Sequence, residues 1–166
     1  MAVDERFALS AGDVTDQHGS LVARATMGSV LFARPPDQVA PADAAAPDLP
    51  TLPTELLTDD GVTITARTIA PPWLANAFGG LHGGAGFLTG AHTLDLAMRQ
   101  ADAGDNPMRT VDVRASFLRP IPADGRAVES TATVMHRGRR LGVARGELRG
   151  SDGRPALLLD ATYVPI

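Results

Sequence analysis

The sequence of 166 residues contains no cysteine and no lysine, so all 15 of its basic residues are arginine. Without cysteine, the chain can form no disulfide, no thiolate metal site and no cysteine nucleophile. Any chemistry must therefore come from histidine, carboxylates, hydroxyls or the backbone. Because the four histidines are scattered along the chain, we also expect no metal site.

Long apolar runs and an excess of positive charge are lacking too. No window approaches 18 uninterrupted apolar residues, and the first ten residues, MAVDERFALS, carry charges where a signal peptide would need an apolar run. The net charge is −4, which argues against broad nucleic-acid binding because phosphate neutralisation dominates that affinity. We therefore expect a soluble, cytoplasmic protein with no nucleic-acid partner and no membrane partner.

The composition is that of a globular domain, with 44% hydrophobic and 20% charged residues. The length suits one ordinary domain with an appendage. Residues 34–53 are rich in proline and alanine, a composition that favours extended, unpacked chain, and are interpreted as a linker. They separate residues 1–33 from a predicted domain over residues 54–166.

Residues 1–33 contain two runs in which apolar and polar residues alternate, joined at TDQHGS, which predicts a β-hairpin. Residues 13–26 also resemble residues 146–162, since both have an acidic turn, a glycine, an apolar run and Ala-Thr. Two unrelated hairpins can share these features. Alternatively, residues 1–33 are the closing strands of a second copy of the domain and pair with the edge of a sheet.

The domain over residues 54–166 is expected to begin with a strand, because Val62, Ile64 and Ala66 alternate with polar residues. A long helix should follow and end before Pro107, which disfavours helical geometry in the residue before it. The apolar face of this helix is expected to consist of Phe87, Ala91, Leu94 and Met98.

After the helix come runs of period two, separated by turn signals at PADGR, HRGRR and GSDGR. The first run is expected to place on one face Val111, Val113, Ala115 and Phe117. A strand, one long helix and a meander of antiparallel strands form an α+β pattern, in which the helix covers one face of the sheet.

The start of the helix is glycine-rich, and Gly83 and Gly84 belong to its first turn. Amide groups there lack intrahelical partners, and glycine lets the carbonyl or phosphate of a ligand approach them. A thioester oxygen at this position would gain hydrogen bonds as negative charge develops on it. His82 either orients a substrate or holds the loop, and Asn76 either caps, forms a turn or holds a water.

The run Asn76-x-x-Gly79-x-x-His82-Gly83-Gly84, followed by a helix and by TVDVRASFLRP and HRGRRLGVARGELRGSDGR, resembles the hotdog-fold thioesterases of the phenylacetic-acid-degradation (PaaI-like) type. The resemblance covers about residues 55–166. It implies a long central helix wrapped by an antiparallel sheet, hydrolysis of an acyl-CoA thioester by water without a further cofactor, and a homodimer or dimer of dimers with sites between subunits.

Carried over to this sequence, the resemblance assigns to Gly83 the backbone amide that polarises the thioester carbonyl. His82 and Asn76 match loop residues that hold the substrate and position the nucleophilic water or the carboxylate. Thr110 stands where some relatives have a serine that helps orient water. The family's catalytic carboxylate lies nine positions after the histidine, where this sequence has Ala91, which cannot act as a base.

Two residues could replace that carboxylate. His92 is the next residue, and Asp95 lies one helical turn after Ala91. One interpretation makes His92 a general base oriented by Asp95. The other makes both residues part of a solvated polar face, with an ordinary ion pair between Asp95 and Arg99.

A second cluster lies at the turn after residue 136, where Arg137, Arg139 and Arg140 could bind the phosphates of coenzyme A. The resemblance places basic residues that contact coenzyme A near this turn, although an exposed arginine-rich hairpin can also be an ordinary solvated turn. We therefore expect an acyl-CoA thioesterase. The alternatives are a catalytically weak hotdog module that binds acyl-CoA or a partner hotdog chain, as Ala91 suggests, and a hotdog dehydratase, which the His-Gly-Gly run fits less well.

Overall fold

The computed structural model describes residues 7–30, 54–101 and 106–166. The chain divides into two compact units, Met1–Gln38 and Val39–Ile166, which are described separately. The predicted linker, residues 34–53, lies outside the described residues. In the ranges that the structure describes, no helix is long and apolar enough to cross a membrane.

The first unit is an antiparallel β-hairpin of β1 (Phe7–Thr15) and β2 (Leu21–Val30). Its turn is closed by Asp16, whose Oδ1 accepts hydrogen bonds from the amides of His18 at 2.8 Å and Ser20 at 2.9 Å. Gly19 has a φ of 81°, which glycine adopts without steric cost. The predicted hairpin is therefore confirmed, including the position of its turn.

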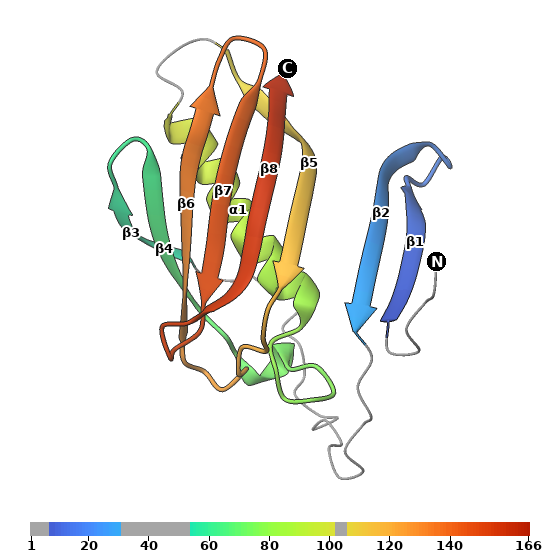
Figure 1. Cartoon of the computed structure of the whole chain (residues 1–166), viewed down its shortest axis with the longest axis vertical. Helices are drawn as coiled ribbons and strands as arrows, with labels where there is room; N and C mark the ends of the chain where they lie inside the picture. Colours follow the sequence, from blue (N-terminus) through green and yellow to red (C-terminus); the bar gives the residue numbers. More distant parts are fainter. Residues whose placement is uncertain (1–6, 31–53, 102–105) are drawn as a thin grey trace. The chain divides into compact units, whose positions relative to one another are not determined.

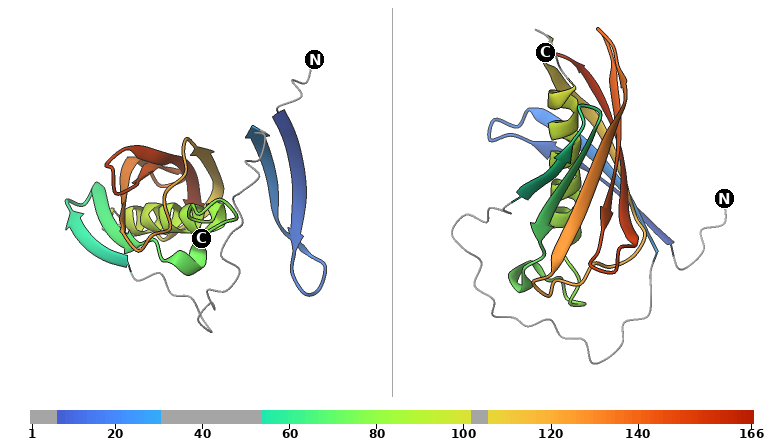
Figure 2. Two further views of the ribbon diagram at one scale, coloured as in Figure 1. Left: turned by 90° about the horizontal axis from the view of Figure 1, so that it is seen from below. Right: turned by 90° about the vertical axis from the view of Figure 1, so that its left-hand side faces the viewer.

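The second unit consists of one long helix packed against a six-stranded antiparallel sheet (Figures 1 and 2). The strand order is β3-β4-β6-β7-β8-β5. In chain order the elements are β3 (Thr54–Asp59), β4 (Thr63–Ile69), η1 (Pro72–Leu74), α1 (Gly83–Gln100), β5 (Met108–Phe117), β6 (Ala127–Arg137), β7 (Gly142–Arg149) and β8 (Pro155–Pro165). The predicted α+β pattern is confirmed.

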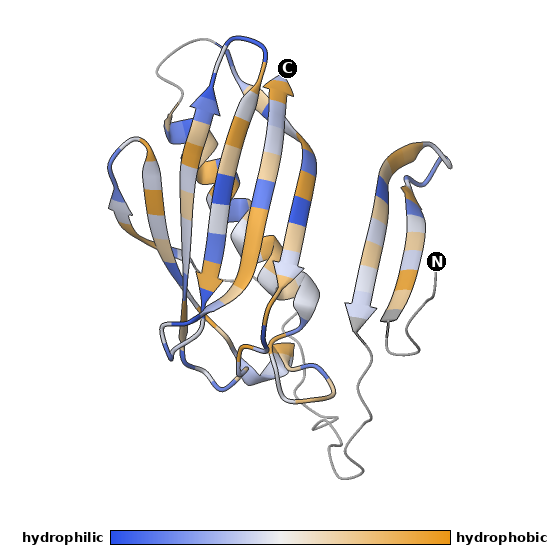
Figure 3. Ribbon diagram, viewed as in Figure 1, coloured by the Kyte–Doolittle hydropathy of each residue, from blue (hydrophilic) through white to orange (hydrophobic). Residues whose placement is uncertain are grey.

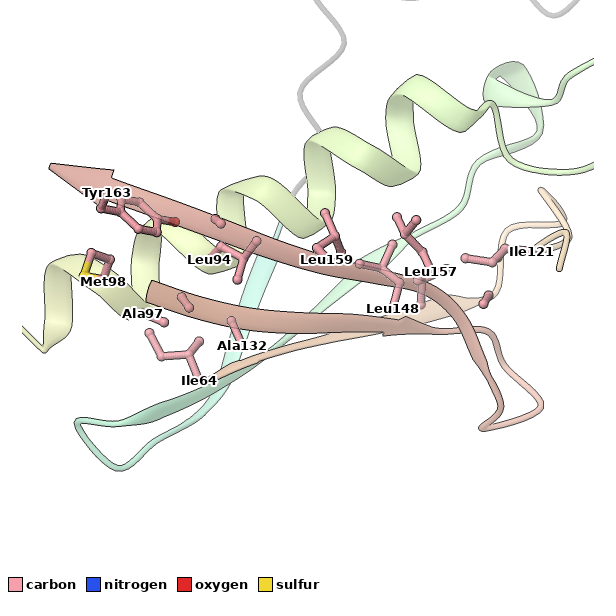
Figure 4. Packing of buried hydrophobic residues seen from close by; sticks show 14 of the residues in the cluster. Ile64, Leu94, Ala97, Met98, Ile121, Ala132, Leu148, Leu157, Leu159 and Tyr163 are labelled. Atoms are coloured by element: carbon pink, nitrogen blue, oxygen red, sulfur yellow. The ribbon is translucent and has the colours of Figure 1, made fainter. Parts of the chain in front are cut away.

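The alternating sequence pattern decides which face of the sheet the helix covers. Hydrophobic and hydrophilic bands alternate along the central strands (Figure 3). The apolar bands of β7 and β8 meet the buried face of α1, where Leu94, Leu148 and Leu159 belong to one buried cluster (Figure 4). A Cβ atom on Gly90 would lie 2.5 Å from Cδ1 of Leu159, so a larger residue there would force the Leu159 side chain to move.

The apolar face predicted for the helix is present. Leu94 and Met98 are fully buried, whereas Phe87 and Ala91 are half-buried. The helix ends at Gln100, well before Pro107.

Other expectations about the strands were wrong. Val62 does not continue the alternation of β4, because it lies in the turn that the Asp60 carboxylate closes, and it is 53% exposed. Val111 is exposed because the register of β5 shifts between Thr110 and Asp112. Phe117, by contrast, keeps the predicted face although it is 57% exposed, because Val113, Ala115 and Phe117 pair with three buried residues of β8, namely Ala161, Leu159 and Leu157.

No sequence signal had predicted β3. This strand forms the outer edge of the sheet, and only two of its six residues are half-buried, so its sequence, TELLTD, shows no alternation.

Candidate active site

The loop before α1 is held in shape by Asn76. Its side-chain Oδ1 accepts hydrogen bonds from the backbone amides of Phe78 at 2.9 Å and Gly80 at 3.2 Å. The backbone amide of Asn76 donates to the Gly80 carbonyl at 2.7 Å. Gly79 completes this turn with a φ of 75°. The Asn76 side chain therefore forms a turn, which was one of the roles predicted for it.

His82 is the N-cap residue of α1. Its Nδ1 accepts a hydrogen bond from the Gly84 amide at 3.1 Å, and its own amide donates to the Leu74 carbonyl at 2.8 Å. Because Nδ1 is the acceptor, the proton of the neutral ring lies on Nε2. The ring is exposed, so His82 caps the helix and still presents Nε2 at the surface.

One amide in the first turn of α1 is left over. The Gly84 amide donates to His82, and the amides of Ala85 and Gly86 donate to the His82 carbonyl. Among the described residues the Gly83 amide has no partner. It lies at the positive end of the helix dipole, and the ring of Phe117 forms an apolar wall 3.6 Å from where a Cβ of Gly83 would be. An oxygen that gains negative charge would be stabilised there.

A polar cluster lies beside the second half of α1. It is formed by Asp95 of the helix, Thr110 of β5 and Tyr163 of β8. The Thr110 hydroxyl donates to Oδ1 of Asp95 at 2.8 Å, and Asp95 is half-buried. The Tyr163 hydroxyl is buried and makes no hydrogen bond of ordinary geometry with the described residues. Burial, followed by the negative charge of Asp95, raises the pKa of this hydroxyl. Asp95 is therefore a fixed carboxylate beside two hydroxyl groups.

His92 does not belong to this cluster. Its ring is exposed, and among the described residues no hydrogen bond joins it to Asp95. Arg99 is exposed, and the ion pairs of the described residues do not include one between Asp95 and Arg99. Neither predicted pairing of Asp95 is formed, because its carboxylate is turned toward Thr110 on β5 instead.

The predicted catalytic residues thus form two groups that lie far apart within one chain. Gly83 and Asp95 are separated by 12 positions of α1, or about 18 Å along the helix axis at a rise of about 1.5 Å per residue. Ala91, at the position of the family's carboxylate, lies between them and is half-buried. A single protomer therefore does not bring the Gly83 amide and the Asp95 carboxylate to the same thioester.

The predicted phosphate-binding arginines lie at the turn between β6 and β7, beside the C-terminal end of α1 (Figure 1). Nη2 of Arg137 donates to the Asn106 carbonyl at 2.8 Å, and the Asn106 side chain donates to the Arg139 carbonyl at 3.2 Å. Arg139 and Arg140 are exposed. An open hollow of about 600 Å³ is lined by His136, Gly138, Arg139, Arg140 and Leu141.

Two residues of these sites were not predicted as such. Tyr163, the only tyrosine, is the last buried residue of β8, and Phe117 was predicted only as part of one face of a strand. Their places depend on the pairing of β5 with β8, for which no local sequence signal exists. Among the described residues there is no group of three or more side chains that could hold a metal ion.

Comparison with known proteins identifies the family and the type of fold. Residues 78–156 match the family model of the thioesterase superfamily, whereas no curated protein matches the sequence. A conserved protein from Pseudomonas aeruginosa is 28% identical, with 69% of this chain and 90% of that chain covered and a TM-score of 0.61.

Two further structures show the same fold. The PaaI protein from the phenylacetic acid degradation operon of E. coli is 21% identical, with 68% of this chain and 79% of that chain covered and a TM-score of 0.61. A hypothetical thioesterase from Streptococcus pneumoniae, solved with coenzyme A, is 16% identical, with 69% and 86% covered and a TM-score of 0.63. Residues 78–156 are therefore a domain of the thioesterase superfamily, and the long helix on a six-stranded antiparallel sheet is the hotdog-type fold of its PaaI neighbours.

Proposed function

We propose that the protein hydrolyses an acyl-CoA thioester at a site formed by two copies of the chain. One copy supplies the Gly83 amide and the other supplies the Asp95 carboxylate. The observation that carries the proposal is the pair of groups on one helix, a free amide at its start and a fixed carboxylate in its second half, within a thioesterase-superfamily domain. Their separation of about 18 Å requires the second copy.

The chemistry needs only these groups and water. Asp95 removes a proton from a water molecule, whose oxygen attacks the thioester carbonyl carbon. The negative charge moves onto the carbonyl oxygen, where the Gly83 amide stabilises it. When the carbonyl re-forms, the carbon–sulfur bond breaks, and the thiolate leaves and takes up the proton. Thr110, by donating to Oδ1, leaves Oδ2 of Asp95 to act as the base.

Asp95 is a better candidate for the base than His92. The Asp95 carboxylate is half-buried and fixed by a hydrogen bond, whereas the His92 ring is exposed and has no partner among the described residues. A base on a fixed side chain keeps the attacking water within reach of the carbonyl carbon. This assignment places the carboxylate one helical turn after Ala91.

The arginine turn lies at the Asp95 end of α1, so one copy can supply both the carboxylate and the phosphate contacts. Arg139 and Arg140 are exposed beside an open hollow, and guanidinium groups bind phosphate through paired hydrogen bonds. In the proposed complex the nucleotide end of coenzyme A lies at this turn, and the thioester lies beside Asp95.

The edge of the sheet at β5 supports pairing of two copies. β5 is the last strand in the sheet, so one of its edges has no neighbour within the second unit. Three apolar side chains on or just after this strand are at least half exposed, namely Val111, Phe117 and Leu118. An unpaired edge with exposed apolar residues favours association with another strand. Phe117 also adjoins Gly83, which puts the free amide next to the proposed interface.

A second candidate function is a binding module with little or no turnover. It is favoured by Ala91, since an alanine cannot act as a base at the family's carboxylate position. In that case the Gly83 amide and the arginine turn would still bind acyl-CoA.

The experiment that separates the two candidates measures thiol release from a panel of short, medium and aromatic acyl-CoA substrates, together with coenzyme A binding by calorimetry. Turnover of any of these substrates, well above the uncatalysed rate, is the expected result. Binding without turnover across the panel would establish the module instead. Mixed dimers test the shared site: Gly83→Pro and Asp95→Asn chains, each inactive, should regain part of the activity when combined.

A further inference from the structure

The hairpin of the first unit repeats the geometry of the β7–β8 hairpin residue by residue. Ala8 pairs with Ser29, and Gly142 pairs with Tyr163. Each residue of the second pair comes 134 positions after its counterpart in the first pair. The same difference holds for every later pair of the two hairpins. Neither loop length nor strand register differs between them.

The irregularities of the two hairpins coincide as well. The register of β1–β2 shifts between Val14 and Thr15, and that of β7–β8 shifts between Leu148 and Arg149, again 134 positions later. Both turns are closed by the same two backbone bonds, and their glycines, Gly19 and Gly153, have φ values of 81° and 73°. A shared shift and a shared turn go beyond what two ordinary hairpins have in common.

The two faces of the hairpins also correspond. Each outer face carries a cross-strand ion pair, Asp13 with Arg24 in one hairpin and Arg145 with Asp160 in the other. The inner face of β7–β8 is fully buried and consists of Gly142, Ala144, Gly146, Leu148, Leu157, Leu159, Ala161 and Tyr163. At the matching positions, β1–β2 has Ala8, Ser10, Gly12, Val14, Ala23, Ala25, Met27 and Ser29.

This face of β1–β2, named the inner face, carries no charged side chain but is largely exposed within the first unit. In β7–β8 the same face meets the buried side of α1, which carries no charged residue either. Gly146, which corresponds to Gly12, lies there against Leu94, at 3.2 Å from where its Cβ would be. An isolated two-stranded hairpin is marginally stable in water, so its inner face needs a cover.

We propose that the inner face of β1–β2 binds the central helix and neighbouring strands of a hotdog domain that lacks its own closing hairpin. The occupant is a polypeptide that supplies an amphipathic helix across the inner face and strands that pair with the free edges of β1 and β2. Its helix carries larger side chains than α1 does where it meets Val14 and Ala25, because these are smaller than Leu148 and Leu159 at the matching positions.

The test uses the full chain and a defined probe. The probe is residues 54–137 of this sequence, which contain α1, β5 and β6 but not β7–β8, with the substitution Gly90→Leu to fill the space left by Ala25. A tagged probe is co-expressed with the full chain and captured. We expect the full chain to be captured with the probe, and to be captured less with a probe that keeps Gly90.

Two variants of the full chain provide the matched control. Ala25 lies on the inner face and Thr26 on the outer face. Ala25→Glu should abolish capture, because it buries a charge against the helix, whereas Thr26→Glu should leave it unchanged. Absence of capture by both probes, or capture that Ala25→Glu does not affect, would overturn the proposal.

Hydrogen exchange gives an independent measurement on the full chain. Without the probe, amides of β1–β2 should exchange much faster than those at matching positions of β7–β8. When about nine tenths of the full-chain molecules are bound to the probe, exchange of these amides should slow by about tenfold, because only the unbound molecules exchange. Equal protection of the two hairpins before any probe is added would show that the inner face is already covered within the chain, and would refute the proposal.

Discussion

The two ends of α1 offer different kinds of chemical group for a reason that lies in their surroundings. At its start, the polar side chains of Asn76 and His82 are occupied in shaping the loop and capping the helix, so the group left for a ligand is a backbone amide. In its second half, backbone groups are satisfied within the helix, and the available group is the Asp95 carboxylate, fixed by Thr110.

This difference suits the two requirements of thioester hydrolysis. A developing negative charge is best met by a donor that cannot ionise and does not move, as an amide at a helix start provides. Activation of water requires a group that exchanges protons, as a carboxylate does. The comparison predicts separate effects for substitutions at the two ends.

The largest effect is expected for Asp95→Asn. Asparagine keeps the shape and can still accept the hydrogen bond from Thr110, but it cannot take a proton from water. We expect kcat for thiol release to fall by about 10²- to 10⁴-fold, the usual contribution of a general base. His92→Ala is the matched control and should leave kcat unchanged; a comparable loss in that variant would return the role of base to His92.

A slightly smaller effect is expected at the helix start. Gly83→Pro removes the amide hydrogen at the first helical position, where proline is tolerated, and should lower kcat by about 10²- to 10³-fold. Gly83→Ala retains the amide, and its Cβ would meet Phe117 at an ordinary 3.6 Å. Equal kcat values for these two variants would argue against carbonyl polarisation by Gly83.

The arginine turn should affect binding and not the chemical step. Replacing Arg139 and Arg140 together by alanine should raise KM for acyl-CoA about tenfold or more, as expected for the loss of one or two charged hydrogen bonds. The same acyl group on pantetheine, which lacks the nucleotide phosphates, serves as the control substrate and should show no change in KM. A parallel rise with both substrates would mean that the turn does not bind the nucleotide.

The smallest effect is expected for the cap. His82→Ala removes the acceptor for the Gly84 amide and should lower the free energy of unfolding by about 1 kcal/mol, measured as a shift of the urea midpoint without a change in slope. His82→Asn can supply a capping oxygen and should recover most of this loss. If His82→Asn were stable but inactive, the exposed Nε2 would have a role in catalysis beyond capping.

The sequence of the loop and helix was enough to predict the residues of the candidate site at the start of α1. It was not enough to predict which residue contacts Asp95. Spacing identified Asn76, His82 and Gly83 as one group, because they are neighbours in the chain and their hydrogen bonds are local. The interpretation of His92 and Asp95 as a pair failed for the opposite reason. Helical spacing puts His92 and Asp95 about one turn apart on α1, whereas the partner of Asp95 is Thr110 on β5, 15 residues later.

By itself, the sequence determined the elements other than β3 and the chemistry that is excluded. The alternation of apolar residues and the stripe along α1 specify an antiparallel sheet covered by one helix, and the lack of cysteine rules out thiol chemistry. Only the tertiary structure decided which groups remain free and which meet. Strand order and the shift in β5 bring Thr110 opposite Tyr163 and next to Asp95. Such contacts depend on the pairing of distant segments, for which local periodicity carries no information.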